Sequence, residues 1–266
     1  MADPHQLLLK YIRKEAKGLE IGPSLNPAVT RKEGYNVKTL DHATKAELIS
    51  KYKHRDTSKI EDVDFVWRGE NYRDIIGSEE MFDWIIASHV IEHTTDLVGF
   101  LSDCSSLLPI GGVLSLAIPD HRFCFDHFRT KTGLGEIIDA NVPGKTRHSL
   151  GTITDYFLNV VQNDGRMAWS PAKKDNSYSY CFDREQARGH ILKAKRDDDY
   201  TDVHSWRFTP SHFHLLMEDL RFLEYTDFGV LECSTTCGHE FFATLEKGLD
   251  SRIDRMEMAT KALSEI

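Results

Sequence analysis

Two acidic residues end short apolar runs at a spacing that favours nucleoside binding. Glu20 lies in the run GLEIG, and Asp41 is the last residue of the run VKTLD. In dinucleotide-binding folds, an acid about 20 residues after the first glycine loop accepts hydrogen bonds from ribose hydroxyls. Each acid alone is equally typical of a solvated strand end. At this spacing the two together favour a cofactor that contains a nucleoside.

The loop after Glu20 is poorly suited to a phosphate group. A pyrophosphate cradle requires the pattern G-x-G-x-x-G, whose glycines let backbone amides approach the anion. Here Gly22 stands alone in GPSLNP, Pro23 has no amide hydrogen, and the Glu20 carboxylate repels an anion. The loop instead favours a cofactor with a sulfonium and an amino-acid head and without phosphate.

The run His89-Val90-Ile91-Glu92-His93 has two chemical interpretations. On a helix, its two histidines and its glutamate share one face, at positions i, i+3 and i+4. The order H-x-x-E-H is also the inverted zinc-peptidase signature, which makes a zinc metallopeptidase an alternative function. That signature lies inside a long helix, however, whereas this run directly follows an apolar strand and precedes a helix-cap pattern at 94–96.

A divalent metal site that is independent of peptidase activity is the second interpretation. Its ligands are His89, Glu92 and His93, and two imidazoles with one carboxylate suit Mn, Fe or Zn better than Mg. The alternative is that His93 only packs beneath the loop and forms hydrogen bonds within the fold.

Alternating strands and helices must position these residues. Short apolar runs predict strands at 18–21, 37–41, 63–67, 82–88 and 112–120. Helical spacing predicts helices at 5–16, 43–52, 96–108, 209–220 and 249–265, and Thr209 with Pro210 marks the start of the fourth. Apolar strands that alternate with helices are typical of a parallel sheet covered on both faces.

The regular pattern is interrupted once, between 121 and 205. The sequence therefore predicts a single domain, 1–266, with a long insertion after the fifth strand that forms a lid or cap over the substrate. Beyond the helix at 209–220, the runs FLEYTDFGVLE and HEFFATLEK predict an antiparallel pair at the edge of the sheet.

Composition limits the class of partner and the compartment. The 266 residues carry a formal charge of −9, which disfavours nucleic acid because binding to phosphate backbones is driven by clustered Lys and Arg. No apolar run approaches the ~20 residues that span a bilayer. Five cysteines without a CxxC motif predict reduced thiols in the cytoplasm. The oligomeric state stays open.

The successive motifs resemble those of class I S-adenosylmethionine-dependent methyltransferases. The residues that carry the resemblance are GLEIGPSLNP, LDH, FDWIIASHVIEH and LLPIGGVLSLAIPD, with VHSWRFTPSHF near the end. The resemblance implies an α/β, Rossmann-like, doubly wound sheet of seven strands, mostly parallel with an antiparallel last strand. The IPD-x-R-F-x-F-D run and the late FTP segment are similar to methyltransferases of bacterial polysaccharide and sugar modification.

The resemblance also implies where the cofactor S-adenosylmethionine lies. Glu20, Gly22 and Pro23 would adjoin its methionine part, and Asp41 would hold the ribose. The adenine would lie at Trp67 and Arg68, where many members carry an acid, and the methionine would extend to Ser88 and His89.

The implied reaction is O-methylation of a sugar, a sugar phosphate or a polysaccharide precursor. A sugar hydroxyl is a weak nucleophile, so a base or a metal must remove or acidify its proton. The candidates at the carboxyl ends of the fourth and fifth strands are His93, Asp120 and His121. Because a fold alone never proves activity, a non-catalytic nucleoside-binding module is a further alternative.

The insertion is the expected binding region for the methyl acceptor. Residues 121–207 hold 14 Lys and Arg against 12 Asp and Glu, which favours an anionic acceptor clamped by Arg122, Arg129 or Arg147. His204 returns to the sheet edge and would face the acceptor. The aromatic residues that would stack on a sugar, or else form a small core, are Phe123, Phe125, Tyr156, Phe157 and Trp169.

Overall fold

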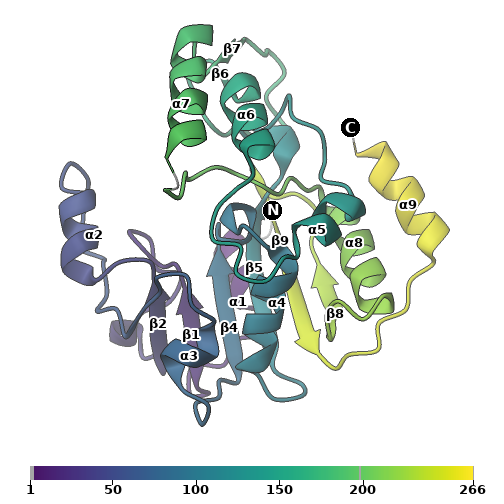
Figure 1. Ribbon diagram of the computed structural model, residues 1–266. Helices are drawn as coiled ribbons and strands as arrows, with labels where there is room; N and C mark the ends of the chain where they lie inside the picture. Colours follow the sequence, from purple (N-terminus) through teal and green to yellow (C-terminus); the bar gives the residue numbers. More distant parts are fainter. Residues whose placement is uncertain (1–2, 198, 266) are drawn as a thin grey trace.

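The computed structural model describes residues 3–197 and 199–265, and seven of the strands in these residues form one central sheet (Figure 1). Its order is β3-β2-β1-β4-β5-β9-β8. The parallel strands are β1 (Gly18–Ile21), β2 (Val37–Asp41), β3 (Phe65–Val66), β4 (Trp84–Ser88) and β5 (Val113–Pro119). The last two strands are β8 (Phe228–Cys233) and β9 (Glu240–Lys247), and β9 runs antiparallel to both β5 and β8. The predicted fold class is confirmed.

The central strands are buried on both faces, which explains their continuous apolar runs. In β1 and β4, Leu19 is paired with Ile85, and both side chains belong to the core beneath α4 (Leu97–Ser106) and α8 (Pro210–Phe222). The next residue pair, Glu20 with Ile86, faces the opposite side, where α1 (Pro4–Leu9) contributes Leu8. A strand alternates its side chains between the two faces, so the Glu20 side chain lies on the face of the sheet that α1 covers.

Several helices are shorter than their apolar patterns predict. The first ends at Leu9 and not at 16, because the following backbone is bound elsewhere: the carbonyls of Arg13 and Lys14 accept hydrogen bonds from the Trp84 indole and the Asn36 amide. The other helices of the sheet region are α2 (Lys45–Lys51), α3 (Tyr72–Ile76) and α9 (Arg255–Ser264). Thr209 precedes α8 as predicted, but its buried hydroxyl oxygen accepts no hydrogen bond from a helix amide.

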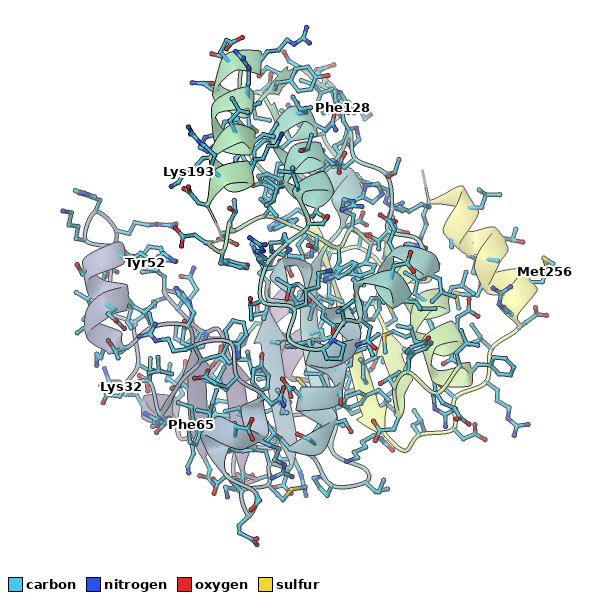
Figure 2. All side chains as sticks on the ribbon, in the orientation of Figure 1. Lys32, Tyr52, Phe65, Phe128, Lys193 and Met256 are labelled. Carbon is cyan, nitrogen blue, oxygen red and sulfur yellow. The ribbon has the colours of Figure 1, made fainter. Side chains whose placement is uncertain are left out.

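The insertion leaves the sheet after β5 and returns before α8. Its elements are α5 (Leu134–Ala140), α6 (Leu150–Asn159), β6 (Val161–Asn163), β7 (Tyr178–Tyr180) and α7 (Arg184–Arg196). Figure 1 shows α6, α7, β6 and β7 as a lobe beyond the carboxyl ends of the parallel strands. A core of Ile153, Phe157, Ala187 and Val203 holds this lobe together. Phe128 lies at its outer end (Figure 2).

Candidate active site

Loops that carry most of the predicted site residues meet at one edge of the sheet. The loops after β1, β2, β3, β4 and β5 begin there, as does β9 at its amino end, and we call this region the carboxyl edge. Because β1 pairs with β2 on one side and with β4 on the other, the strand order reverses at β1. Open α/β sheets bind their ligands beyond the carboxyl ends of the strands at such a reversal. A depression lined by Ser105, Arg221 and Asp227 lies at the opposite end of the sheet.

Glu20 is turned toward the first loop itself. Its carboxylate accepts hydrogen bonds from the backbone amides of Ala28 at 2.6 Å and Val29 at 3.4 Å, and the residue is 1% exposed. Burial raises the pKa of Glu20 to about 7, although the two amide hydrogen bonds act in the opposite direction. The sequence predicts a carboxylate open to the cofactor, whereas the structure places it beneath the loop that the cofactor would contact.

The first loop is fixed by its backbone conformation and by Asp41. Gly22 has φ +67°, in the left-handed region, and a side-chain Cβ there would lie 2.9 Å from Cγ2 of Val90. The buried Asp41 carboxylate accepts hydrogen bonds from the amides of Ser24 at 2.9 Å and His42 at 2.7 Å. Pro23 is buried between these points. Asp41 therefore ties the end of β2 to the loop after β1.

Trp67 and Arg68 follow β3 and lie beside the end of β2. The Trp67 amide donates to the carbonyl of Asp41, and its indole donates to the carbonyl of Glu70 at 2.7 Å. Arg68 donates to the carbonyl of His42 and pairs with Glu47 at the start of α2. Both side chains thus flank Asp41, and their contact with adenine stays a prediction.

His89, directly after Ser88 at the end of β4, has a left-handed backbone with φ +53°. Its Nε2 lies 2.7 Å from Oε2 of Glu240, and its ring lies near that of His239. Burial opposes the charged imidazole, but the carboxylates of Glu240 and Glu92 outweigh this effect and raise the pKa of His89 to about 10. His89 is therefore directed to the amino end of β9.

The H-x-x-E-H run is not an α-helix. Only Ile91–His93 are helical, in a single 3₁₀ turn that follows the left-handed His89. The helical face that a zinc peptidase requires is absent from these described residues, so the metallopeptidase interpretation loses its structural basis.

The predicted metal ligands His89, Glu92 and His93 do not form one group whose ligand atoms all lie within 4.8 Å, although Nδ1 of His89 and Nε2 of His93 lie 3.5 and 4.0 Å from Oε1 of Glu92. The described residues offer two groups whose ligand atoms all lie within 4.8 Å of one another: His89 with His239 and Glu240, and Glu92 with His93 and His204. The prediction of His89, Glu92 and His93 as one set assumed an α-helical spacing, which the backbone does not adopt.

His93 and His204 form the centre of the second group. Their rings cross edge to face with centroids 4.5 Å apart. Nδ1 of His93 lies 2.7 Å from Oδ1 of Asp202, and Nδ1 of His204 lies 2.5 Å from Oδ2 of Asp126. Each imidazole is thus oriented by a carboxylate and directs its Nε2 elsewhere. Neither Asp126 nor Asp202 is among the predicted site residues, and no local pattern indicates these contacts, because Asp202 holds His93 and Asp126 holds His204, each far away in sequence.

Asp120 and His121 differ sharply in their surroundings. The Asp120 carboxylate is fully buried and accepts hydrogen bonds from the Arg122 guanidinium at 2.6 and 2.9 Å and from the Thr236 hydroxyl at 2.6 Å. Neither ring nitrogen of His121 has a hydrogen-bond partner, and burial lowers the pKa of His121 to about 4. Asp120 is therefore held in an ion pair with Arg122, whereas His121 is a neutral imidazole with a free lone pair.

The arginines predicted to clamp an anion are largely engaged within the protein. Arg122 pairs with Asp120, and the fully buried Arg129 side chain pairs with Asp126 and Asp155. Arg147 lies on the exposed loop before α6. Two of the three predicted clamps thus stabilise the insertion and are not directed at a ligand.

Four of the five predicted aromatic residues divide into two groups, and the fifth, Phe123, is half-buried in the 3₁₀ turn after β5. Phe157 and Trp169 are buried in the insertion, as the small-core interpretation predicts. Phe125 and Tyr156 are only partly buried and lie against His204, with Phe125 at a centroid distance of 4.5 Å. Aromatic surface therefore adjoins the His93–His204 pair.

Known proteins that resemble this chain are found among solved structures. No protein-family model and no curated protein matches it. Among solved structures it is similar to a SAM-dependent methyltransferase from Methanosarcina mazei, with 13% identity, 94% of this chain and 100% of that chain covered, and a TM-score of 0.48. It is also similar to the CcbJ methyltransferase from Streptomyces caelestis, with 9% identity, coverage of 92% and 97%, and a TM-score of 0.44. A third is an S-adenosylmethionine-dependent methyltransferase from Clostridium acetobutylicum, with 10% identity, coverage of 92% and 91%, and a TM-score of 0.44.

Within the described residues, no helix combines the length and the apolar character needed to cross a membrane.

Proposed function

We propose that the chain is an S-adenosylmethionine-dependent methyltransferase that binds its cofactor across the carboxyl ends of β1, β2 and β4. The observation that carries the proposal is that two backbone amides of the first loop already donate hydrogen bonds within the protein. The N–H groups of Ala28 and Val29 donate to Glu20, so they are not available to a pyrophosphate. A cofactor that bears a sulfonium and no phosphate suits a loop built on a carboxylate.

The roles of the individual residues follow from their positions along this edge. Gly22 and Pro23 form the wall of the first loop, and Asp41 at the end of β2 offers a carboxylate for the ribose hydroxyls. Trp67 and Arg68 flank Asp41 on the adenine side. Ser88 ends β4 and His89 follows it, and we propose that the methionine part and the reactive methyl group lie there. Glu20, beneath the loop, acts as a positioning residue and favours positive charge above it.

We assign the acceptor to the saccharides, as a sugar, a sugar phosphate or a polysaccharide precursor. This assignment depends on the resemblance in the sequence and on the partly exposed rings of Phe125 and Tyr156 beside His204. In the reaction, a hydroxyl oxygen forms a bond to the methyl carbon while the carbon–sulfur bond breaks, and the sulfur retains the electron pair. The hydroxyl proton passes to an imidazole at the carboxyl edge, His93 or His121. Asp120 keeps Arg122 in place.

The cytoplasm is the compartment that we propose for this reaction. The five cysteines of the chain are free thiols, which suits a reducing environment.

Isothermal calorimetry with S-adenosylhomocysteine, NAD and ATP tests the cofactor. We expect S-adenosylhomocysteine to bind and the two phosphate-containing nucleotides not to bind; tight binding of NAD or ATP alone would overturn the proposal. Methyl transfer is then measured with a panel of sugars, phosphorylated sugars and nucleotide-linked sugars. If the protein binds S-adenosylhomocysteine and methylates none of the panel, the saccharide assignment fails and the cofactor assignment stands.

A further inference from the structure

A buried carboxylate without a hydrogen-bond partner lies at the centre of the carboxyl edge. Glu92 is 1% exposed, and neither of its carboxylate oxygens has a hydrogen-bond partner. Two imidazole nitrogens lie within ion-pair distance of Oε1, Nδ1 of His89 at 3.5 Å and Nε2 of His93 at 4.0 Å. An ionised carboxylate is very costly to bury without compensation, so buried charges are paired or bind metals.

Two imidazoles complete a cluster around this carboxylate. The ligand atoms of Glu92, His93 and His204 all lie within 4.8 Å of one another. Two donors that are each about 2.1 Å from one ion can be at most about 4.2 Å apart. The 4.0 Å between Glu92 and His93 is already within this limit. No separation in the cluster exceeds 4.8 Å, so the widest one is at most about 0.6 Å beyond this limit.

The outer contacts of both histidines are those of metal ligands. Metal-binding histidines donate their other ring N–H to a carboxylate, which fixes the tautomer and the ring orientation. Here Asp202 holds Nδ1 of His93 at 2.7 Å and Asp126 holds Nδ1 of His204 at 2.5 Å. Asp126 is in turn held by Arg129 at 2.6 Å. The two Nε2 atoms are thus the free ligand atoms, and Glu92 is the third donor.

We propose that Glu92, Nε2 of His93 and Nε2 of His204 bind a divalent transition metal of the Zn, Mn or Fe type. Two imidazoles with one carboxylate suit these ions, and three protein ligands leave a coordination position open. His93 is about one-third exposed and Glu92 and His204 are buried, so the open position is on the His93 side, at the carboxyl edge. The site needs no assumption about the cofactor.

The metal site also refines the proposed function, on which this further role depends. A divalent cation bound at the open position to the acceptor hydroxyl would lower the pKa of that hydroxyl. His93 is then a ligand, and the neutral His121 remains to take the proton. Phe125 and Tyr156, which lie beside His204, would contact the same acceptor.

Metal content is the direct test. The purified full-length protein is dialysed against Zn²⁺, desalted and measured by elemental analysis, and we expect about one Zn²⁺ per chain. The substitutions Glu92→Gln and His204→Gln should abolish the bound metal. Wild-type protein without stoichiometric metal would overturn the proposal, as would a Glu92→Gln protein that keeps it.

The chain offers a matched control variant and a variant that should alter the site without impairing folding. His239→Gln removes a ligand from the neighbouring group at His89 and Glu240, and it should leave the metal content unchanged. Loss of the metal in this variant would show that the ion binds at that neighbouring group, which would overturn the proposal. Asp202→Asn changes a mostly exposed side chain, so we expect this variant to fold, and it should weaken Zn²⁺ affinity 10–100-fold in a competition titration with a chelator. Unchanged affinity in Asp202→Asn would contradict the assigned ligand geometry.

Cofactor binding is measured on the same samples. Zn²⁺ bound without S-adenosylhomocysteine binding would overturn the proposed function and leave the metal site intact. S-adenosylhomocysteine binding without Zn²⁺ would overturn the metal site alone.

Discussion

The carboxylate of Glu20 and the backbone amide of Ala28 are joined by a 2.6 Å hydrogen bond across the first loop. This contact makes Glu20 an internal support of the loop. It also explains how a loop with one glycine and two prolines keeps a fixed shape at the point where the strand order reverses. The loop's own acid occupies amides that a phosphate would otherwise bind.

Replacing Glu20 with Gln should change how stability depends on pH. The folded pKa of about 7 lies above the unfolded value of 4.5, so the folded state binds this proton more tightly. Its contribution is therefore complete below the unfolded pKa and is lost as pH rises toward 7, by about 3 kcal/mol in all. Urea unfolding of both proteins across this pH range measures the difference. A constant difference between wild type and variant would contradict the buried, protonatable carboxylate.

Replacing Gly22 with Ala should distort the first loop. The left-handed backbone costs an alanine about 1 kcal/mol, and the added Cβ meets Val90 at 2.9 Å. Gly144→Ala is the control, because Gly144 has φ +72° and no atom lies within 4 Å of the position that its added methyl group would take. We expect Gly22→Ala to lose more stability than the control and to weaken S-adenosylhomocysteine binding, as measured by unfolding and calorimetry. Equal stability losses and unchanged binding would exclude a role for the Val90 contact.

Replacing Asp41 with Asn should affect cofactor binding more than folding. The amides of Ser24 and His42 donate to separate oxygens of Asp41, so asparagine keeps an acceptor for only one of them, and it also removes the charge that a ribose hydroxyl prefers. A hydrogen bond to a charged group contributes about 1.5–3 kcal/mol, so S-adenosylhomocysteine affinity should fall about 10- to 100-fold. Asp64→Asn alters a carboxylate that binds the Thr39 amide and should leave the affinity unchanged. Calorimetry measures the S-adenosylhomocysteine affinity of both variants. Equal losses of affinity in the two would mean that Asp41 does not bind the ribose.

Replacing Arg129 with Met should destabilise the insertion strongly. The change leaves the buried Asp126 without its guanidinium and the carbonyl of His204 without a donor. Breaking a buried ion pair on one side typically costs about 3–5 kcal/mol. The surface pair of Arg188 with Glu185 is the control, and Arg188→Met should cost less than about 1 kcal/mol. Urea denaturation measures both, and a similar small loss in each would mean that Arg129 is not the anchor of the lobe.

The sequence predicted the sheet well because its signals are local. Apolar runs at 18–21 and 37–41 become β1 and β2 with the predicted bounds, since both strands are buried on both faces. The helix predicted at 5–16 is wrong in its second half, because Trp84 and Asn36 bind the carbonyls at 13 and 14. No pattern within 5–16 contains that information.

The site was harder to predict because it is assembled from distant segments. Glu92 and His93 are adjacent in sequence, but His204 reaches them only through the return of the insertion. The local H-x-x-E-H pattern suggested His89, whose ring lies between Glu92 and Glu240, with Nδ1 3.5 Å from the first and Nε2 2.7 Å from the second. Arg129 illustrates the same limit, since its charge suggests a ligand clamp and its burial reveals an internal partner.

The two ends of the insertion lie side by side. Asp120 and Phe208 form a parallel bridge, and the amide of His121 donates to the carbonyl of Phe208 at 3.0 Å. When the two ends of an inserted segment are adjacent, the length and sequence of that segment can vary without displacing the elements that flank it, here β5 and α8. Under the proposed function, the region assigned to the acceptor can therefore change in evolution while the region assigned to the cofactor stays constant.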